Sequence, residues 1–241
     1  MVVLLAIAGI IKGFSIAGLA DYWLVALICI SAYGIGTVVY AKTLQKVEAS
    51  AFSMLFATHA VWVMALGIIL FQESLTFFQI AGSLLIFLSV GIVSKDISSV
   101  FKQKGTLLGL LTGLIYGIAI TSWAFVGRHV DTVSWAAVSF LGSAVVSFMA
   151  SPKSIIKIPA MLKGKILSKM LLLGAFYAAG SLAMLFAYKY GSLALVSPLC
   201  QTGIIVTTLL ALILLKNERN RIKGKIIASI ISFLGVLFIL L

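Results

Sequence analysis

The chain has 241 residues, of which 62% are hydrophobic and only 10% are charged. A soluble domain of this size carries about 25% charged residues, and a water-soluble fold could not hide so much apolar surface. The formal net charge of +12 does not indicate nucleic-acid binding, because the basic residues lie in a few loops between apolar runs. We therefore expect an integral membrane protein without a nucleic-acid partner.

Nine apolar runs follow one another along the chain, most of them close to the roughly 20 residues that a membrane-spanning helix needs. Backbone groups find no water in hydrocarbon, so each run should be a helix. The first run is the weakest, because Lys12 lies in its middle. It can be read as a whole helix, as a half-helix ending near Lys12, or as a cleaved signal peptide. The runs cover residues 1–20, 23–42, 50–71, 76–94, 106–127, 132–150, 168–188, 192–215 and 224–241.

The second half of the chain repeats the first. Ser53 leads through an apolar run to Glu73, 20 residues later, and Ser197 leads through another to Glu218, 21 residues later. A final apolar run follows each Glu. The complete pattern would be five helices plus five, whereas this chain shows four plus five. Because five is odd, the second repeat should enter the membrane in the opposite orientation to the first.

The loops are asymmetric in charge. If they lie on alternate sides of the membrane, one side receives 15 of the 18 Lys and Arg residues, and the other keeps Lys12, Arg128 and Lys189. By the positive-inside rule the basic side faces the cytoplasm, where its loops can also rest on anionic lipid head groups. This orientation would place the C-terminus outside.

Several of these motifs match one known pattern. The stretch LFQESL at residues 70–75, with Gln79 and Gly82 after it, resembles the end of an EamA repeat, and Glu218 with Gly235 is a looser version. Residues 105–128 resemble the opening helix of a second EamA repeat, and residues 177–198 resemble its third and fourth helices. The resemblance covers nearly the whole chain. It points to the EamA family of the drug/metabolite transporter superfamily.

The resemblance implies an all-α membrane protein, a multi-span helical bundle of two inverted EamA-like repeats, with about nine helices here and ten in the full pattern. Residues 1–94 would form the first repeat, with about four helices and the first one missing or cut, and residues 105–241 the second, with five. Family members are usually drawn with both termini in the cytoplasm, which conflicts with the charge asymmetry.

The function that the family implies is secondary active transport by alternating access of small metabolites, amino-acid-like or drug-like, most often as efflux across the plasma membrane. We expect a small-molecule substrate, membrane lipids and a coupling proton as partners, and no cofactor. A non-transporting or truncated membrane protein and an intramembrane lipid-modifying enzyme are the alternatives. The sequence leaves the substrate, the coupling ion, the direction, the absolute orientation and the oligomeric state open.

Polar side chains inside spans are costly and are therefore candidates for function. His59 lies in mid-span with Trp62 one turn on. A His there could bind substrate or relay a proton, or it could form a hydrogen bond between helices. Gln201 and Thr202 follow Pro198, which frees a backbone carbonyl. They could coordinate a ligand, or they could be polar contacts beside a kink.

Four aromatic residues complete the set of candidates. They form two pairs spaced by seven residues, so each pair shares one helix face: Tyr33 with Tyr40, and Tyr116 with Trp123. Such faces could line a substrate cavity, or they could serve packing or an interfacial aromatic belt.

Other motifs receive structural interpretations. Glu73 and Glu218 could couple to protons, but a cap on the next helix is the favoured reading. Gly109, Gly113 and Gly117 indicate a face for close helix packing. The sequence shows no Ser/His/Asp set, metal-ligand cluster or nucleotide fingerprint, so we expect no catalytic residue, no metal and no enzyme activity.

Overall fold

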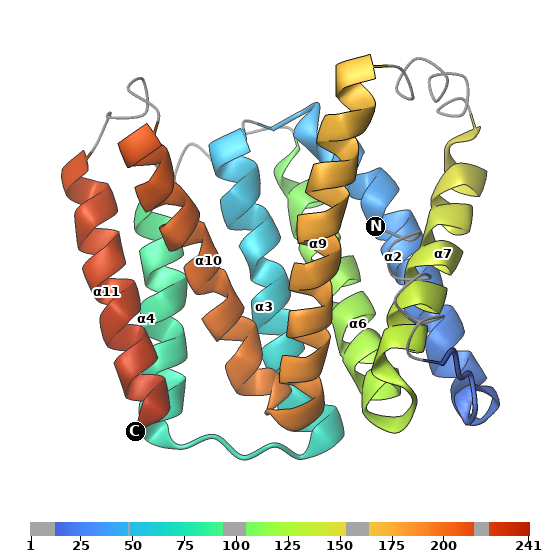
Figure 1. Ribbon diagram of the computed structural model, residues 1–241. Helices are drawn as coiled ribbons and strands as arrows, with labels where there is room; N and C mark the ends of the chain where they lie inside the picture. Colours follow the sequence, from blue (N-terminus) through green and yellow to red (C-terminus); the bar gives the residue numbers. More distant parts are fainter. Residues whose placement is uncertain (1–12, 48, 94–104, 153–163, 215–221) are drawn as a thin grey trace. The chain divides into compact units, whose positions relative to one another are not determined.

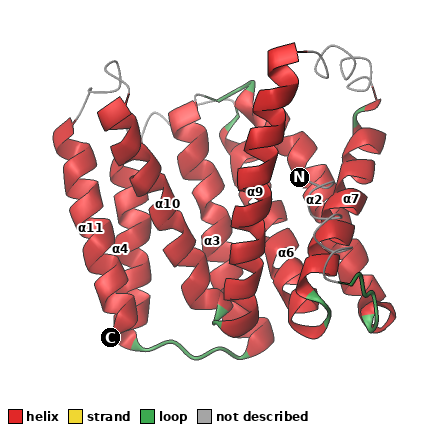
Figure 2. Cartoon of the chain, in the orientation of Figure 1, coloured by secondary structure: helices red, strands yellow, loops and turns green. Residues whose placement is uncertain are grey.

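The computed structural model describes residues 13–47, 49–93, 105–152, 164–214 and 222–241. Within these ranges it contains eight α-helices, one short 3-10 helix and no strand. Figure 1 shows how the helices are arranged, and Figure 2 colours the chain by secondary structure. The elements are η1 (Leu19–Tyr22), α2 (Trp23–Leu44), α3 (Ala49–Phe71), α4 (Phe77–Val93), α6 (Thr106–His129), α7 (Thr132–Ala150), α9 (Gly164–Tyr190), α10 (Leu193–Leu214) and α11 (Ile222–Leu240).

Eight of the nine predicted spans are found as helices, with ends that differ from the predicted ones by a few residues. The first span differs. Residues 13–18 are not helical, which excludes a single helix reaching residue 20, and Gly18 has a left-handed φ of 77° just before η1. The half-helix reading, and the apolar segment that a signal peptide would need, concern residues 1–12, which lie outside the described residues.

The helices suit a membrane. Among the described residues, four continuous segments are long and apolar enough to cross one: Leu19–Leu44, Thr106–His129, Thr132–Ala150 and Leu167–Tyr190. Large apolar side chains also project from outer faces, and Phe77, Leu107 and Met149 are 80%, 80% and 77% exposed. Such exposure opposes folding in water but costs nothing in hydrocarbon. The protein is an all-α integral membrane protein, as its composition predicted.

The chain divides into two compact units, and each draws on both halves of the sequence. Unit 1 contains Met1–Val39 and Ile118–Gly191, and unit 2 contains Tyr40–Gly117 and Ser192–Leu241. Three crossings therefore connect them, one inside α2, one inside α6 and one in the turn between α9 and α10.

In unit 2, helices that occupy equivalent places in the two repeats pack against each other (Figure 1). Gly82, near the start of α4, lies against Gly235, near the end of α11: a Cβ added to Gly82 would lie 2.5 Å from the Gly235 carbonyl oxygen. The reverse addition would bring a Cβ at Gly235 to 2.7 Å from the Gly82 oxygen. Contacts between an early residue of one helix and a late residue of the other mean that α4 and α11 run antiparallel.

The pair α3 and α10 is built in the same way. Gly67, late in α3, approaches Ala194, early in α10, while Ala60, further back in α3, accepts a hydrogen bond from Ser197, further on in α10. These helices also run antiparallel. Antiparallel packing of equivalent helices is what two oppositely inserted repeats require, so the inverted repeat predicted from the sequence is confirmed within this unit.

The predicted glycine face of α6 packs against α3 in the same unit. A Cβ at Gly109 would meet Leu55, one at Gly113 would meet Thr58, and one at Gly117 would lie 2.5 Å from the Cβ of Trp62. Small residues allow this approach of two backbones, from which membrane helices gain much of their association energy.

Unit 1 consists mainly of α2, the second part of α6, α7 and α9. Its core contains Trp123 of α6 and Trp135 of α7, both 1% exposed. The Trp123 indole donates to the Ser139 hydroxyl at 3.0 Å, and the Trp135 indole donates to the Trp123 carbonyl at 2.9 Å. Both indole N–H groups are therefore satisfied inside the unit, which a buried Trp requires.

The α4–α11 contact leads to a stability prediction. Gly82→Ala should destabilise the protein by about 1–3 kcal/mol, or roughly 2–12 °C in Tm, because the new methyl group meets backbone atoms that cannot move aside. Gly180→Ala on α9 is the matched control, since nothing lies within 4 Å of its added Cβ. Thermal unfolding of both variants in one detergent is the measurement. Equal Tm values would contradict the described packing of α4 on α11.

Candidate functional site

The candidate site in unit 2 centres on a buried polar pair. His59 from α3 and Gln201 from α10 are 7% and 5% exposed. The His59 Nε2 lies 3.4 Å from the Gln201 Nε2, and the His59 Nδ1 lies 2.7 Å from the carbonyl oxygen of Phe56 in its own helix. One residue comes from each repeat, so the antiparallel packing of α3 on α10 brings the two together.

The contacts of this pair determine its tautomer. A carbonyl oxygen can only accept, so the His59 Nδ1 donates to Phe56. In a neutral imidazole the other nitrogen is then an acceptor, and the Gln201 amide N–H donates to it. A proton on Nε2 would turn that acceptor into a donor facing another donor. Protonation of His59 would therefore require the Gln201 amide to turn and present its oxygen.

An aromatic cluster lies beside this pair in unit 2. The Phe56 ring contacts His59 with centroids 4.6 Å apart and Tyr116 at 5.0 Å. Tyr40 stands edge-on to Phe52 at 4.6 Å and to Phe56 at 5.3 Å. The structure thus brings two predicted aromatics, Tyr40 and Tyr116, to the same cluster as His59. Sequence reasoning missed Phe52 and Phe56, although their spacing of four residues and the position of Phe56 one turn before His59 were a usable signal.

The other predicted residues of unit 2 occupy different surroundings. Trp62 is 43% exposed and packs over Gly117 of α6. The Thr202 hydroxyl donates to the Leu199 carbonyl of its own helix at 2.7 Å. Pro198 lies inside α10, as predicted, and it removes the N–H that would bond the carbonyl of Ala194. Ligand roles for Trp62 and Thr202 stay predictions.

Tyr33 and Trp123 lie in unit 1. Their rings are edge-on with centroids 6.1 Å apart, and both contact Phe140 of α7. The Trp123 indole already has its acceptor in Ser139. This environment matches the packing interpretation of the two aromatics, and a role for them in substrate binding stays a prediction.

Glu73 caps a helix, although not the next one in the chain. Its carboxylate accepts hydrogen bonds from the Ser192 hydroxyl at 2.8 Å, the Leu193 N–H at 3.0 Å and the Ala194 N–H at 2.9 Å. It therefore caps α10, in the other repeat, whereas the sequence pointed to α4. Glu218, its counterpart in the second repeat, lies outside the described residues.

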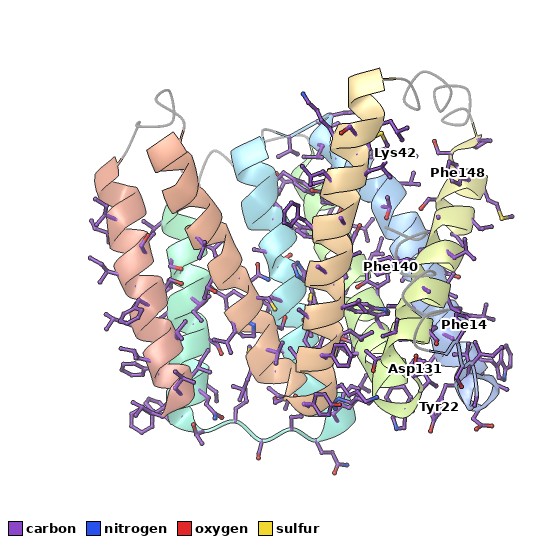
Figure 3. All side chains as sticks on the ribbon, in the orientation of Figure 1. Phe14, Tyr22, Lys42, Asp131, Phe140 and Phe148 are labelled. Carbon is purple, nitrogen blue, oxygen red and sulfur yellow. The ribbon has the colours of Figure 1, made fainter. Side chains whose placement is uncertain are left out.

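The basic residues at the ends of α6 and α9 are also caps. Its guanidinium donates to the carbonyls of Tyr188 and Gly191, both at 2.8 Å, at the end of α9. Lys189, at the end of α9, makes the converse contact. Its ammonium donates to the Val130 carbonyl at 3.4 Å, just beyond α6. Asp131 caps the start of α7 through the Ser134 N–H at 2.9 Å (Figure 3). Each charge complements the dipole of the helix end it meets.

The His59–Gln201 contact can be tested by a double-mutant cycle. His59→Ala, Gln201→Ala and the double variant should give a coupling energy of about 0.5–1.5 kcal/mol in unfolding, the usual net contribution of one hydrogen bond. Ser89→Ala on α4 is the control partner, because the described hydrogen bond of the Ser89 hydroxyl lies within its own helix, to the Ile86 carbonyl. Its coupling to His59 should be close to zero. Strict additivity of the two Ala substitutions would contradict the pair.

Comparisons with known proteins agree with this architecture. The sequence model described as the "EamA-like transporter family" matches residues 1–95 and 103–241. A solved structure described only as "Crystal structure of protein" is similar to this chain with a TM-score of 0.76 and 16% sequence identity, over 100% of this chain and 84% of that one, which shows a shared fold. A comparison with curated proteins finds no match. Since the family match extends over both repeats and nearly all of the sequence, the chain belongs to the EamA-like transporter family.

Proposed function

We propose that this protein is a secondary active transporter that moves a small organic metabolite, amino-acid-like or drug-like, out of the cell by alternating access. The plasma membrane is the proposed location. The substrate contacts the His59–Gln201 pair and the adjacent rings of Tyr40 and Tyr116. Family membership supports the transport class, and the geometry of unit 2 supports the choice of residues.

One observation carries the proposal: a polar pair is buried between two oppositely running helices, with one member supplied by each repeat. If the pair only joined two helices, a simpler donor and acceptor would do this equally well. This one combines a group that can take up a proton with an amide that both donates and accepts. Aromatic faces alongside it suit the apolar part of a small solute.

The arrangement also accounts for how substrate and helix movement would be linked. Solute groups that bond to Gln201 compete with its bond to His59, and that bond connects α3 of the first repeat to α10 of the second. Binding would therefore weaken one of the contacts that hold these helices together. A substrate that lowers the cost of separating two elements is what alternating access requires.

Transport can be tested in proteoliposomes with a panel of radiolabelled amino acids and cationic, neutral and anionic drug-like solutes. Gln201→Ala should lower the flux of the transported solute about tenfold, because the loss of one well-placed hydrogen bond is worth about 1.4 kcal/mol. Ser89→Ala, which alters a buried hydroxyl of α4, should keep wild-type flux. If well-folded wild-type protein moved no member of the panel, the alternative of a non-transporting membrane protein would be favoured.

We further propose that the coupling ion is a proton carried by His59. The described contacts of its ring are the Phe56 carbonyl and ring and the Gln201 amide, none of which is charged. A proton on Nε2 would reverse the hydrogen bond to Gln201 and so change what the amide offers to a solute.

Coupling can be separated from binding with His59→Gln, which keeps a hydrogen-bonding side chain but cannot titrate. In this variant a pH gradient should no longer drive uphill solute movement, while downhill flux persists at a reduced rate. Uphill accumulation in wild-type vesicles should disappear when a protonophore is added. Gradient-driven accumulation by the variant at the wild-type level would refute proton coupling through His59.

A further inference from the structure

The carboxylate of Glu73 joins the two repeats through hydrogen bonds to Ser192, Leu193 and Ala194, a contact here called the latch. We propose that Glu73 acts as a positioning residue for the candidate binding pair. It holds the first turn of α10, and through that helix it sets the place of Gln201 against His59. Releasing it frees the start of α10 from α3 and opens the pair from this end. The proposal deepens the proposed function and rests on it for its role in transport.

The carboxylate has an unusually complete set of donors at this helix start. Oε1 accepts from the Leu193 N–H, and Oε2 accepts from both the Ala194 N–H and the Ser192 hydroxyl. The first N–H groups of a helix have no partner inside it, and a negative charge there is further favoured by the helix dipole. The half-buried position of Glu73 strengthens these charge-assisted bonds relative to bulk water.

The local backbone is shaped to deliver this side chain. Gln72 adopts a left-handed φ of 53°, which turns the chain sharply at the end of α3. Gly67, one turn before that end, leaves the space that the carboxylate fills: an added Cβ would lie 2.9 Å from Oε2 of Glu73 and 3.2 Å from the Ala194 nitrogen. A left-handed non-glycine residue is uncommon and costs free energy, so the chain accepts strain here in order to point Glu73 back at α10.

The first turn of α10 depends on this latch because the helix is interrupted soon after it. Pro198 supplies no N–H to the Ala194 carbonyl. Between the latch and Pro198, the described polar contact to α3 is a long one, 3.4 Å from the Ser197 hydroxyl to the Ala60 carbonyl. The polar contacts of the short segment from Leu193 to Ser197 are therefore short at its start and long at its end. Gln201 lies one turn beyond it.

The chemistry of the latch distinguishes Glu from close substitutes. Three donors converge on acceptor-only oxygens, so Glu73→Gln would place an amide N–H₂ group against N–H donors and would remove the charge. Glu73→Asp keeps the charge but is one methylene short. Gly67→Ala leaves Glu73 intact and instead pushes its carboxylate away from α10. All three changes should loosen the same segment.

The test uses thiol reactivity and needs no transported solute. Ser197→Cys is introduced together with Cys200→Ser, so that the reactive thiols are those at position 197 and the native Cys29. Ser197 is 1% exposed and Cys29 is 0% exposed, so in the detergent-solubilised protein both should react slowly with a maleimide. Adding Glu73→Gln should raise the rate at position 197 at least tenfold, and Gly67→Ala should raise it several-fold, while Cys29 in unit 1 stays unreactive.

Asp131→Asn is the matched control, because Asp131 is also a carboxylate that caps a helix start, that of α7 in unit 1. It should leave the rate at position 197 unchanged. The latch is refuted if Glu73→Gln leaves this rate unchanged, if Asp131→Asn raises it equally, or if Cys29 becomes reactive in parallel, which would indicate general unfolding. Because no flux is measured, a failed transport assay would count against the proposed function and not against the latch.

Discussion

Helices in a bilayer gain little from apolar contact alone, since lipid tails are as apolar as leucine, so they associate through close packing and a few polar contacts. The reciprocal approach of Gly82 and Gly235 is the clearest example in this protein, because each glycine leaves space for the backbone of the other. It joins the last helix of one repeat to the last helix of the other. The same antiparallel arrangement is found for α3 and α10, where it places His59 beside Gln201.

The same arrangement explains why polar groups gather where they do. A donor or acceptor buried in hydrocarbon must find a partner inside the protein. Three hydrogen-bonded contacts of this kind follow one another between α3 and α10. They join Glu73 to the start of α10, Ser197 to Ala60, and Gln201 to His59. They form a series of contacts between the repeats, with distances of 2.8–3.0 Å at Glu73 and 3.4 Å at each of the other two pairs. In the proposed alternating-access cycle these two helices would separate and rejoin, and contacts that differ in length along the interface suit such a movement.

Much of the fold could be predicted from the sequence, because the apolar runs are long and their breaks carry charge. The glycine face of α6 was also predictable, since a spacing of four residues places Gly109, Gly113 and Gly117 on one side of a helix. The pairing of His59 with Gln201 was not, although each was identified separately, because it depends on the register of two antiparallel helices. Glu73 was correctly interpreted as a cap but assigned to α4, the nearest helix in sequence, because the left-handed turn at Gln72 could not be foreseen.

The exchanged caps at the ends of α6 and α9 bear on how the protein is inserted. If the loops alternate across the membrane as the sequence predicts, Arg128 and Lys189 belong to the less basic side. Arg128 donates to the carbonyls of Tyr188 and Gly191, and Lys189 donates to the Thr132 hydroxyl and the Val130 carbonyl. A cation occupied in this way has less to offer to lipid phosphates or to the insertion machinery. We therefore expect the effective charge difference between the two sides of the membrane to be larger than a count of Lys and Arg suggests, because these two cations also serve the fold as helix caps.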